Sequence, residues 1–285
     1  MKITLTGANG YLGSNLKEYF SNSHEVQTLS LRLETLGDYE NKLLAFNPDV
    51  VVHCGWGLGN SHSDISDVGQ LDNVHVGCKL LESISKLDNP NFMGFGSFSE
   101  YGRINSPAKE SDTELPVNLY GLTKNSLRFV SHDFCRIMGI GWSWIRPCYT
   151  YGKNDVSTRL IPKVFDSCLN KNDVVLNSCS SVVDYLYIDD FCSAIGHLLE
   201  SSSSGVYNIC SGKEYMISDV IKKIQKITGV YDTISYDKSL DRDNSYSYIC
   251  GDNTKLRNMG WDSSCEISDG LYSTLQYYSL ECGAI

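Results

Sequence analysis

Short apolar runs alternate along this chain with longer stretches in which apolar residues recur at helical spacing. Val50, Val51 and Val52 form a continuous apolar run, which is typical of a strand buried on both faces of a parallel sheet. Over residues 71–87 apolar side chains recur at three- and four-residue intervals, which predicts an amphipathic helix. This alternation predicts an α/β fold built on a doubly wound parallel sheet.

The same patterning locates the other elements of the first half of the chain. Further strands are predicted at residues 3–5, 24–30 and 141–147, and residues 92–102 are predicted to contain a strand and its exit. Further helices are predicted in the second half of residues 1–20, at 40–46 and at 120–138. Residues 57–70, rich in Gly, Ser and Asp, are predicted to form a loop that borders the active site.

Residues 1–20 place three glycines between the first strand and the first helix. Gly7 permits a tight turn out of the strand, Gly10 lets the backbone approach a pyrophosphate, and Gly13 lets the helix lie close to the sheet. The first N–H groups of that helix would face the anion. An ordinary turn can also contain such a triplet, but strand, spacing and helix agree here, so the pattern favours a dinucleotide site.

Composition sets limits on the fold and on the partners. The chain has 285 residues, of which 41% are hydrophobic, enough for one large α/β domain with a smaller lobe. Its net charge of −10 and the lack of a basic block argue against a nucleic-acid surface. No apolar run approaches the length of a membrane span, so we also expect no membrane partner.

Cysteine and histidine usage bears on metals and on the compartment. The eleven cysteines include no CxxC pair and the six histidines form no HExxH, so we expect no bound metal. The first residues already predict a strand, which leaves no room for a signal peptide. We therefore expect a cytoplasmic protein with reduced thiols.

Residues 6–13 read TGANGYLG, which resembles the TGxxGxxG fingerprint of the extended short-chain dehydrogenases. These are NAD(P)-dependent sugar-nucleotide epimerases, dehydratases and reductases, and the resemblance continues over most of the chain. It implies a Rossmann domain over residues 1–150 that binds NADP and carries a catalytic triad. It also implies a smaller α/β substrate-binding lobe, mainly from residues 151–285, with the two halves interleaved.

The catalytic motifs of that family have matches further along the chain. Residues 92–102 resemble a strand that runs into Ser-Ser-x-x-x-Tyr-Gly, and residues 116–124 match P-x-x-x-Y-x-x-x-K. A four-residue spacing puts the Tyr and the Lys on one helix face. The resemblance implies a catalytic triad of Ser97, Tyr120 and Lys124, with Ser99 as the near competitor of Ser97.

These three residue types suit proton transfer to a carbonyl. A free tyrosine has a pKa of about 10, and an adjacent ammonium lowers that pKa by favouring the phenolate. Lys124 would supply the charge and bind the nicotinamide ribose hydroxyls, while Ser97 would donate a hydrogen bond to the substrate carbonyl. Any one of the three could be an ordinary surface or turn residue, but all three in order behind the glycines favour a catalytic centre.

The end of the second predicted strand distinguishes NAD from NADP. An NAD site usually places an acid there to accept hydrogen bonds from the ribose 2′-hydroxyl, whereas an NADP site offers Arg. Here the strand ends at Ser30, Arg32 follows, and Glu34 lies beyond the strand. Arg32 and Glu34 would also fit ordinary loop charges, but the pattern favours NADP(H) over NAD(H).

The resemblance implies further cofactor contacts. Asp38 and Tyr39 resemble an adenine-contacting segment, as a surface turn also would, and residues 53–56 resemble a His-x-Ala-(Ala or Gly) strand end beside the phosphates and ribose. Trp56 could instead pack in the core. The expected cofactor contacts are Gly7, Asn9, Gly10, Tyr11, Leu12, Gly13, Ser30, Arg32, Asp38, Tyr39, Cys54, Gly55, Trp56, Pro147 and Cys148.

Substrate contacts depart from the family pattern. Tyr149 replaces the substrate-contacting Asn of R-P-x-N-x-Y-G, and Val183 replaces an Arg in residues 182–191, which resemble a strand written RDylyVdD. Arg242 matches the Arg that grips diphosphate in many relatives, although a surface loop charge would look the same. The expected substrate contacts are Ser99, Tyr149, Arg159 and Arg242.

The chain most resembles the short sugar-nucleotide 4-ketoreductases that make CDP-paratose and CDP-abequose for lipopolysaccharide O-antigen. This implies NADPH-dependent reduction of the 4-keto group of a nucleotide-activated 6-deoxy or 3,6-dideoxy hexose. The implied partners are a nucleotide-diphosphate sugar and a second copy of the chain in a homodimer. The alternatives are an NAD-dependent sugar-nucleotide 4-epimerase and a non-catalytic NADP-sensing protein, a class that tends to lose the Tyr or the Lys.

Overall fold

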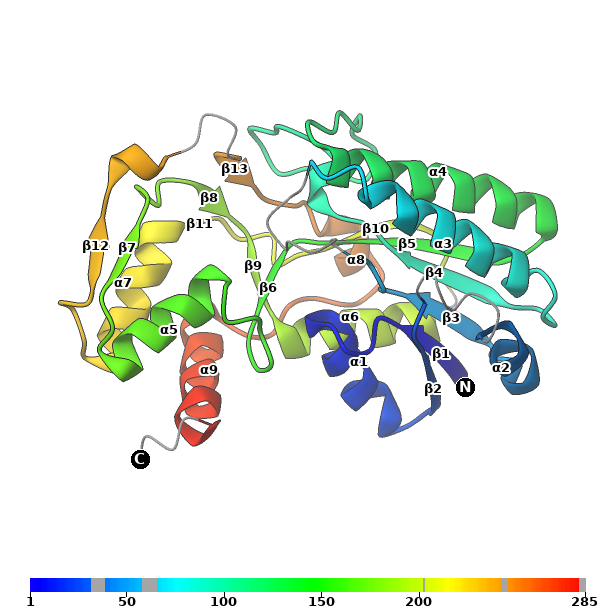
Figure 1. The fold of residues 1–285 in the computed structure, drawn as a ribbon, viewed down its shortest axis with the longest axis horizontal. Coiled ribbons are helices and arrows are strands. Elements are labelled where there is room, and N and C mark those ends of the chain that lie inside the picture. Colours follow the sequence, from blue (N-terminus) through cyan, green and yellow to red (C-terminus); the bar gives the residue numbers. More distant parts are fainter. Residues whose placement is uncertain (32–38, 58–65, 202, 242–245, 282–285) are drawn as a thin grey trace. The chain divides into compact units, whose positions relative to one another are not determined.

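The computed structural model describes residues 1–31, 39–57, 66–201, 203–241 and 246–281. The chain divides into two compact units. Unit 1 comprises Met1–Arg103, Lys109–Pro147 and Cys192–Ile209, and unit 2 comprises Ile104–Ala108, Cys148–Phe191 and Cys210–Ile285. Each unit therefore combines segments that lie far apart in the sequence (Figure 1).

Unit 1 is built on a parallel sheet whose strand order, in the described residues, is β10-β5-β4-β3-β1-β2. The valine run 50–52 forms most of β3 and is no more than 4% exposed. The chain crosses from β2 at one edge to β3 on the other side of β1, so the predicted doubly wound parallel sheet is confirmed. The strands are β1 (Lys2–Thr6), β2 (Glu25–Leu29), β3 (Val50–His53), β4 (Asn91–Phe95), β5 (Gly141–Pro147) and β10 (Gly205–Ile209).

Helices cover both faces of this sheet. On one face α3 (Gln70–Ile84) and α4 (Leu119–Met138) lie side by side, and α1 (Tyr11–Ser21) lies on the other (Figure 1). Gly77 allows the close approach of α3 and α4, because an added Cβ there would lie 2.7 Å from the Leu127 side chain. The two remaining helices that contribute to this unit are α2 (Tyr39–Phe46) and, from Cys192 onward, α6 (Ile188–Glu200).

Unit 2 packs α5 (Leu160–Asn170), α7 (Ile217–Thr228) and α9 (Ile267–Glu281) around one apolar core. Phe165, Ile221 and Leu271 from these helices are 1% exposed or less. Short strands and two short helical segments complete the unit. They are β6 (Tyr149–Tyr151) paired with β9 (Tyr185–Tyr187), β7 (Val174–Leu176) with β12 (Ile234–Tyr236), β8 (Val182–Val183) with β11 (Tyr215–Met216) and β13 (Tyr248–Ile249), α8 (Thr254–Asn258) and η3 (Lys238–Leu240).

The expected continuous strand at residues 182–191 is wrong. β8 and β9 are short, and α6 begins at Ile188. Between the two strands the buried Asp184 carboxylate accepts hydrogen bonds from Ser211 N at 2.9 Å and Gly212 N at 2.8 Å. A buried carboxylate needs such donors. The pairing partner changes here, because β8 pairs with β11 and β13 whereas β9 pairs with β6.

Among the described residues, no helix is both long and apolar enough to cross a membrane. The same part of the chain contains no group of three or more His, Cys, Asp or Glu side chains arranged to hold a metal ion.

Candidate active site

The glycine loop between β1 and α1 is closely packed on its inner side and open on its outer side. Gly7 has a φ of +73°, and an added Cβ would lie 2.5 Å from Gly55 N. A Cβ on Gly13 would overlap the Gly7 carbonyl oxygen, whereas a Cβ on the exposed Gly10 would make only a 3.4 Å contact. No side chain caps the helix at Gly10. The loop therefore fits a bound pyrophosphate at the start of α1.

The end of β3 is held beside this loop by Thr6. Gly55 N donates to Thr6 Oγ1 at 3.2 Å, Cys54 Sγ donates to the Thr6 carbonyl at 2.9 Å, and His53 Nδ1 lies 2.7 Å from Thr6 Oγ1. Burial, with a smaller contribution from Lys124, lowers the pKa of His53 to about 3. A neutral His53 thus anchors the segment in which Cys54, Gly55 and Trp56 were expected to meet a cofactor.

Ser97 lies just beyond β4, where it caps the short η2 turn (Phe98–Glu100). Its hydroxyl accepts a hydrogen bond from Ser99 N at 3.1 Å and also bonds the Tyr120 side chain. Its own backbone N–H donates to Glu100 Oε1 at 2.8 Å. The structure therefore brings Ser97 to Tyr120, and Ser99 is the neighbour that orients the Ser97 hydroxyl.

The start of α4 positions Tyr120 and Lys124. The Asn118 side chain caps the helix by accepting from Gly121 N at 2.8 Å. Gly121 packs so closely on η2 that a Cβ there would overlap the Ser99 carbonyl oxygen. One turn beyond Tyr120, Lys124 is 3% exposed and its Nζ donates to the Phe95 carbonyl at 2.6 Å. All three expected catalytic side chains meet where β4 ends.

The electrostatics of this cluster differ from the expectation for Tyr120. Burial lowers the pKa of Lys124 to about 7 and raises the pKa of Tyr120 to about 12, although the Ser97 hydrogen bond acts in the opposite direction on Tyr120. The expected lowering of the Tyr120 pKa by an ammonium is therefore wrong for the protein alone. Desolvation of the phenolate is the largest cause, and the nearby charge of Glu100 acts in the same direction.

Trp56 is a prominent part of the cluster. Lys124 Nζ lies 3.9 Å from the centroid of the indole, whose plane is 88° from the Tyr120 ring with 6.3 Å between centroids. The indole N–H donates to Gln70 Oε1 at 2.7 Å. Asn73 fixes the next residue by bonding both the N–H and the carbonyl of Gly57 at 2.7 Å.

Glu100 holds the Ser97 backbone in place and was not among the residues expected from the sequence. Its carboxylate is fully buried and accepts hydrogen bonds from Ser97 N, from Trp144 Nε1 at 3.1 Å and from Arg146 Nε at 2.8 Å. A buried carboxylate with these three donors fixes the positions of the groups around it.

Two further charges complete this network. Glu114 accepts from Arg146 Nη2 at 2.6 Å and pairs with Arg128 Nη2 at 3.0 Å. Arg146 is fully buried, and Arg128 on α4 is 9% exposed. The network thus joins the Ser97 turn to helix α4.

The remaining residues that were expected to contact the cofactor lie at several separate places in the structure. Ser30 is exposed directly after β2, Tyr39 begins α2 with its side chain in the core, and Pro147 ends β5. Asn9, Tyr11 and Leu12 belong to the glycine loop and the first turn of α1, and Cys148 is buried in unit 2. The structure describes neither Arg32 nor Asp38, nor the expected substrate contact Arg242.

Unit 2 brings the expected substrate residues Tyr149 and Arg159 to one cavity of about 210 Å³. Arg159 donates to Asp155 Oδ1 at 2.7 Å and to the Thr150 carbonyl at 2.8 Å. The Tyr149 and Tyr185 rings lie 5.9 Å apart. Asp155 and Tyr185 also line this cavity, and no sequence motif marked either of them.

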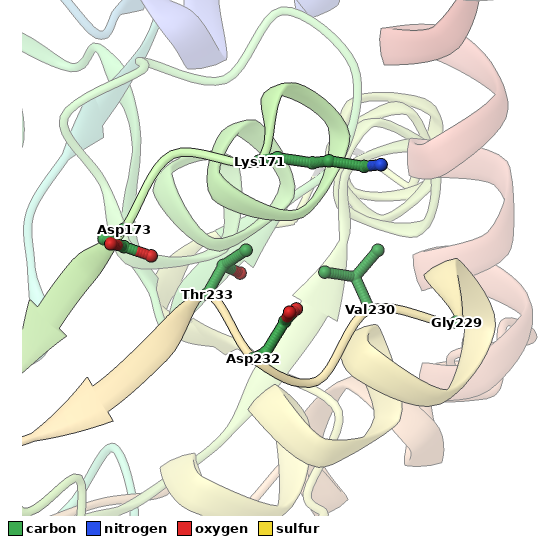
Figure 2. A pocket seen from close by; sticks show the side chains of 6 residues that line it. All are labelled: Lys171, Asp173, Gly229, Val230, Asp232 and Thr233. Carbon is green, nitrogen blue, oxygen red and sulfur yellow. The ribbon is translucent and has the colours of Figure 1, made fainter.

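A second cavity of unit 2, about 320 Å³ in volume, lies where the loops after α5 and α7 meet (Figure 2). None of the expected site residues lines it. Its lining residues are Lys171, Asp173, Gly229, Val230, Asp232 and Thr233.

Comparison with known proteins shows the family. Residues 3–210 match the model of the NAD dependent epimerase/dehydratase family. The chain belongs to this family. The expected resemblance is therefore confirmed, and family membership supports an enzyme that uses a nicotinamide cofactor.

Two curated relatives and one solved structure illustrate the similarity. The chain is 29% identical over 269 residues to the dTDP-6-deoxy-L-talose 4-dehydrogenase (NAD(+)) of Aggregatibacter actinomycetemcomitans, covering 83% of this chain and 97% of the relative. It is 24% identical to the CDP-abequose synthase of Salmonella muenchen, covering 96% and 97%. The UDP-glucose 4-epimerase of Thermus thermophilus, solved with NAD, superposes with a TM-score of 0.89 at 18% identity over the full length of both chains. This last match confirms the fold alone.

Proposed function

We propose that this protein is an NADPH-dependent reductase of the 4-keto group of a nucleotide-activated 6-deoxy or 3,6-dideoxy hexose. The observation that carries the proposal is the meeting of Ser97, Tyr120 and Lys124 where β4 ends. The names of relatives support the substrate class, since they include a dTDP-6-deoxy-L-talose 4-dehydrogenase and a CDP-abequose synthase.

In this proposal each residue of the cluster has one task. The bound dinucleotide supplies the hydride. Tyr120 donates its hydroxyl proton to the carbonyl oxygen, and Ser97 donates a hydrogen bond to the same oxygen as negative charge develops there. Lys124 binds the ribose hydroxyls next to them. Cys54 and Gly55 lie beside the glycine loop and line the phosphate path.

The protonation state of Tyr120 is compatible with the proposed reduction. With a pKa raised to about 12 by burial, Tyr120 is a neutral phenol at pH 7 and so carries the proton that a reduction consumes.

A dehydratase would need more than this cluster provides. Loss of water from a sugar requires an acid that protonates the leaving hydroxyl. The turn after Ser97 contains one carboxylate, Glu100, and Arg146 and the Ser97 N–H both bond it. The cluster therefore suits carbonyl chemistry better than dehydration.

NADP(H) is the proposed cofactor because β2 ends at Leu29, the exposed Ser30 that follows is not an acid, and Arg32 lies two residues further along the sequence. The NAD(+) in the name of one relative keeps NAD(H) as the alternative. Likeness in fold to 4-epimerases similarly keeps a sugar-nucleotide 4-epimerase as the second candidate function.

The proposed substrate contacts are Tyr149 and Arg159, which line the unit 2 cavity, Ser99 of unit 1, and Arg242, which the structure does not describe. A reducing, cytoplasmic setting fits the ten described cysteines, which are all free thiols. The proposed pathway is the synthesis of deoxysugars for surface polysaccharide.

We further propose a homodimer that buries an exposed apolar stripe on α4. Leu122, Phe129 and Ile137 are 50%, 55% and 71% exposed and share one helix face. Light scattering after size-exclusion chromatography should give the mass of two chains for wild type and of one chain for Phe129→Glu. A monomeric wild type would refute this part of the proposal.

The experiment that tests the function is NADPH oxidation measured against 4-keto-6-deoxy sugar nucleotides, with CDP and dTDP substrates first, followed by GDP and UDP. The proposal expects the enzyme to turn over at least one of these sugar nucleotides and to release a product reduced at C4. Interconversion of 4-epimers without net NADPH consumption would instead identify the epimerase. No turnover of either kind, with NADPH bound, would leave the non-catalytic alternative.

A further inference from the structure

Trp56 covers the ammonium that the proposed function assigns to the nicotinamide ribose. Lys124 Nζ lies 3.9 Å from the indole centroid and 5.9 Å from the centroid of the Tyr120 ring. Its one hydrogen-bond acceptor given by the described residues is the Phe95 carbonyl, at 2.6 Å. Because Lys124 is only 3% exposed while Trp56 is half-buried, the indole forms the outer cover of the ammonium.

A hydroxyl that accepts a hydrogen bond from Nζ must approach to about 3 Å. With the indole in this position, the whole Lys124 residue is 3% exposed, which leaves little surface for such an approach. The cover is also anchored, since the indole N–H bonds Gln70 at 2.7 Å. The observed position of Trp56 therefore obstructs the approach of a ribose to Lys124 Nζ.

We propose that Trp56 is a plug on Lys124, which the nicotinamide ribose displaces when the dinucleotide binds. The inference rests on the proposed function in one respect, that Lys124 binds the ribose hydroxyls. Displacement exchanges a cation–π contact for hydrogen bonds from the ammonium. The plug keeps water off Lys124 and Tyr120 before the cofactor arrives, and it weakens cofactor binding as a consequence.

The test compares two ligands that differ in whether they reach Lys124. NADP⁺ contains the nicotinamide ribose, whereas adenosine 2′,5′-bisphosphate carries the adenosine and 2′-phosphate alone. Calorimetric titration should show that Trp56→Ala binds NADP⁺ about two- to thirty-fold more tightly than wild type, the range expected from a lost cation–π contact. Its affinity for adenosine 2′,5′-bisphosphate should be unchanged. NAD⁺ and AMP form the matching pair if the protein prefers NAD.

Trp56→Phe is the second variant, because it keeps an aromatic cover but a weaker cation–π partner. Its NADP⁺ affinity should lie between those of wild type and Trp56→Ala. Weaker binding of NADP⁺ by Trp56→Ala would show that Trp56 is a contact and overturn the plug. Equal changes in the affinities for NADP⁺ and adenosine 2′,5′-bisphosphate would also overturn the plug, since they would indicate a general effect of the substitution on the segment around Trp56.

Fluorescence gives a readout that does not depend on the affinities. Of the four tryptophans, Trp142, Trp144 and Trp261 are at most 8% exposed, so Trp56 is the one that responds to events at the surface of the site. NADP⁺ should change the emission of wild type but not of Trp56→Phe, and adenosine 2′,5′-bisphosphate should change neither. An unchanged wild-type spectrum with NADP⁺ bound would overturn displacement.

Lys124→Met separates failure of the plug from failure of the proposed function. If this variant binds NADP⁺ as wild type does, the ribose role of Lys124 fails, and with it the part of the proposed function on which the plug depends. If it binds NADP⁺ more weakly while Trp56→Ala does not bind more tightly, the plug alone fails.

Discussion

The Ser97 backbone N–H donates a hydrogen bond to Glu100 Oε1 at 2.8 Å. The same carboxylate is fully buried and accepts from Arg146 Nε at 2.8 Å. One carboxylate thus connects the proposed hydrogen-bond donor of the reaction to an ion-pair network in unit 1. The position of Ser97 should therefore depend on the charge of Glu100.

Glu100→Gln keeps the shape of this side chain and removes its charge. Because Arg146 and Arg128 would lose a buried partner, we expect the free energy of unfolding to fall by about 3 kcal/mol, measured by urea denaturation. We also expect kcat to fall more than the KM for NADPH rises, since Ser97 contacts the substrate and not the cofactor in our proposal.

The matched control for Glu100→Gln is Glu82→Gln. Glu82 also pairs with a cation, Lys79, but its side chain is 58% exposed. Water screens such a pair, so this variant should keep the wild-type unfolding midpoint and kcat. A Glu100→Gln enzyme with wild-type stability and turnover would show that the network does not hold Ser97.

The second prediction concerns the proton donor. Tyr120→Phe keeps the ring against Trp56 but removes the hydroxyl, so turnover should fall by a factor on the order of 10² or more while NADPH affinity, read by fluorescence, stays unchanged. Ser97→Ala should also lower turnover with little effect on NADPH binding. Ser126→Ala is the control, because the Ser126 hydroxyl donates to the Leu122 carbonyl within α4 and is not part of the proposed site. Near-wild-type turnover by Tyr120→Phe would refute the assignment.

The parts of the site that could be predicted from the sequence are those that depend on local spacing. Gly7, Gly10 and Gly13 shape one turn, and Tyr120 and Lys124 share a helix face because they are four residues apart. Such features follow from the geometry of a single element. The parallel sheet was equally predictable, because strands buried on both faces leave continuous apolar runs.

The rest of the site depends on contacts between distant segments. Glu100, Glu114, Arg128 and Arg146 come from four different places in the chain, and no spacing rule relates them. Trp56 could pack in the core or contact a cofactor, and only the fold brings it over Lys124. The raised pKa of Tyr120 was unpredictable for the same reason, since burial by surrounding segments is its main cause.

The third prediction concerns cofactor choice. Arg32 follows the exposed Ser30 at the end of β2, and a guanidinium pairs well with a 2′-phosphate. Arg32→Ala should therefore weaken NADPH binding by about tenfold or more and leave NADH binding nearly unchanged, as measured by the two dissociation constants. Lys17→Ala, an exposed basic residue on α1, is a control for net charge. Equal affinity of wild type for NADH and NADPH would contradict the proposed selectivity.

The fourth prediction follows from the burial of Lys124, which lowers its pKa from 10.5 to about 7. Below pH 7 the folded and unfolded chains both carry the ammonium, and the folded protein bears the full cost of desolvating it. Between about pH 7 and 10.5 the unfolded chain binds the proton and the folded protein does not, so the contribution of Lys124 to stability rises with pH.

Lys124→Met removes this titration and keeps a side chain of similar length. Its free energy of unfolding should exceed that of wild type by on the order of 1 kcal/mol or more at pH 6, and the difference should shrink steadily as the pH rises from 7 towards 10. Loss of the hydrogen bond to the Phe95 carbonyl adds an offset that does not vary with pH, so the slope is the diagnostic quantity. Urea denaturation of both proteins at pH 6, 7.5 and 9 measures it. If the free energies of unfolding of wild type and Lys124→Met vary in parallel over that range, Lys124 titrates alike in the folded and unfolded chains. That result would refute the desolvation of the Lys124 ammonium beneath Trp56.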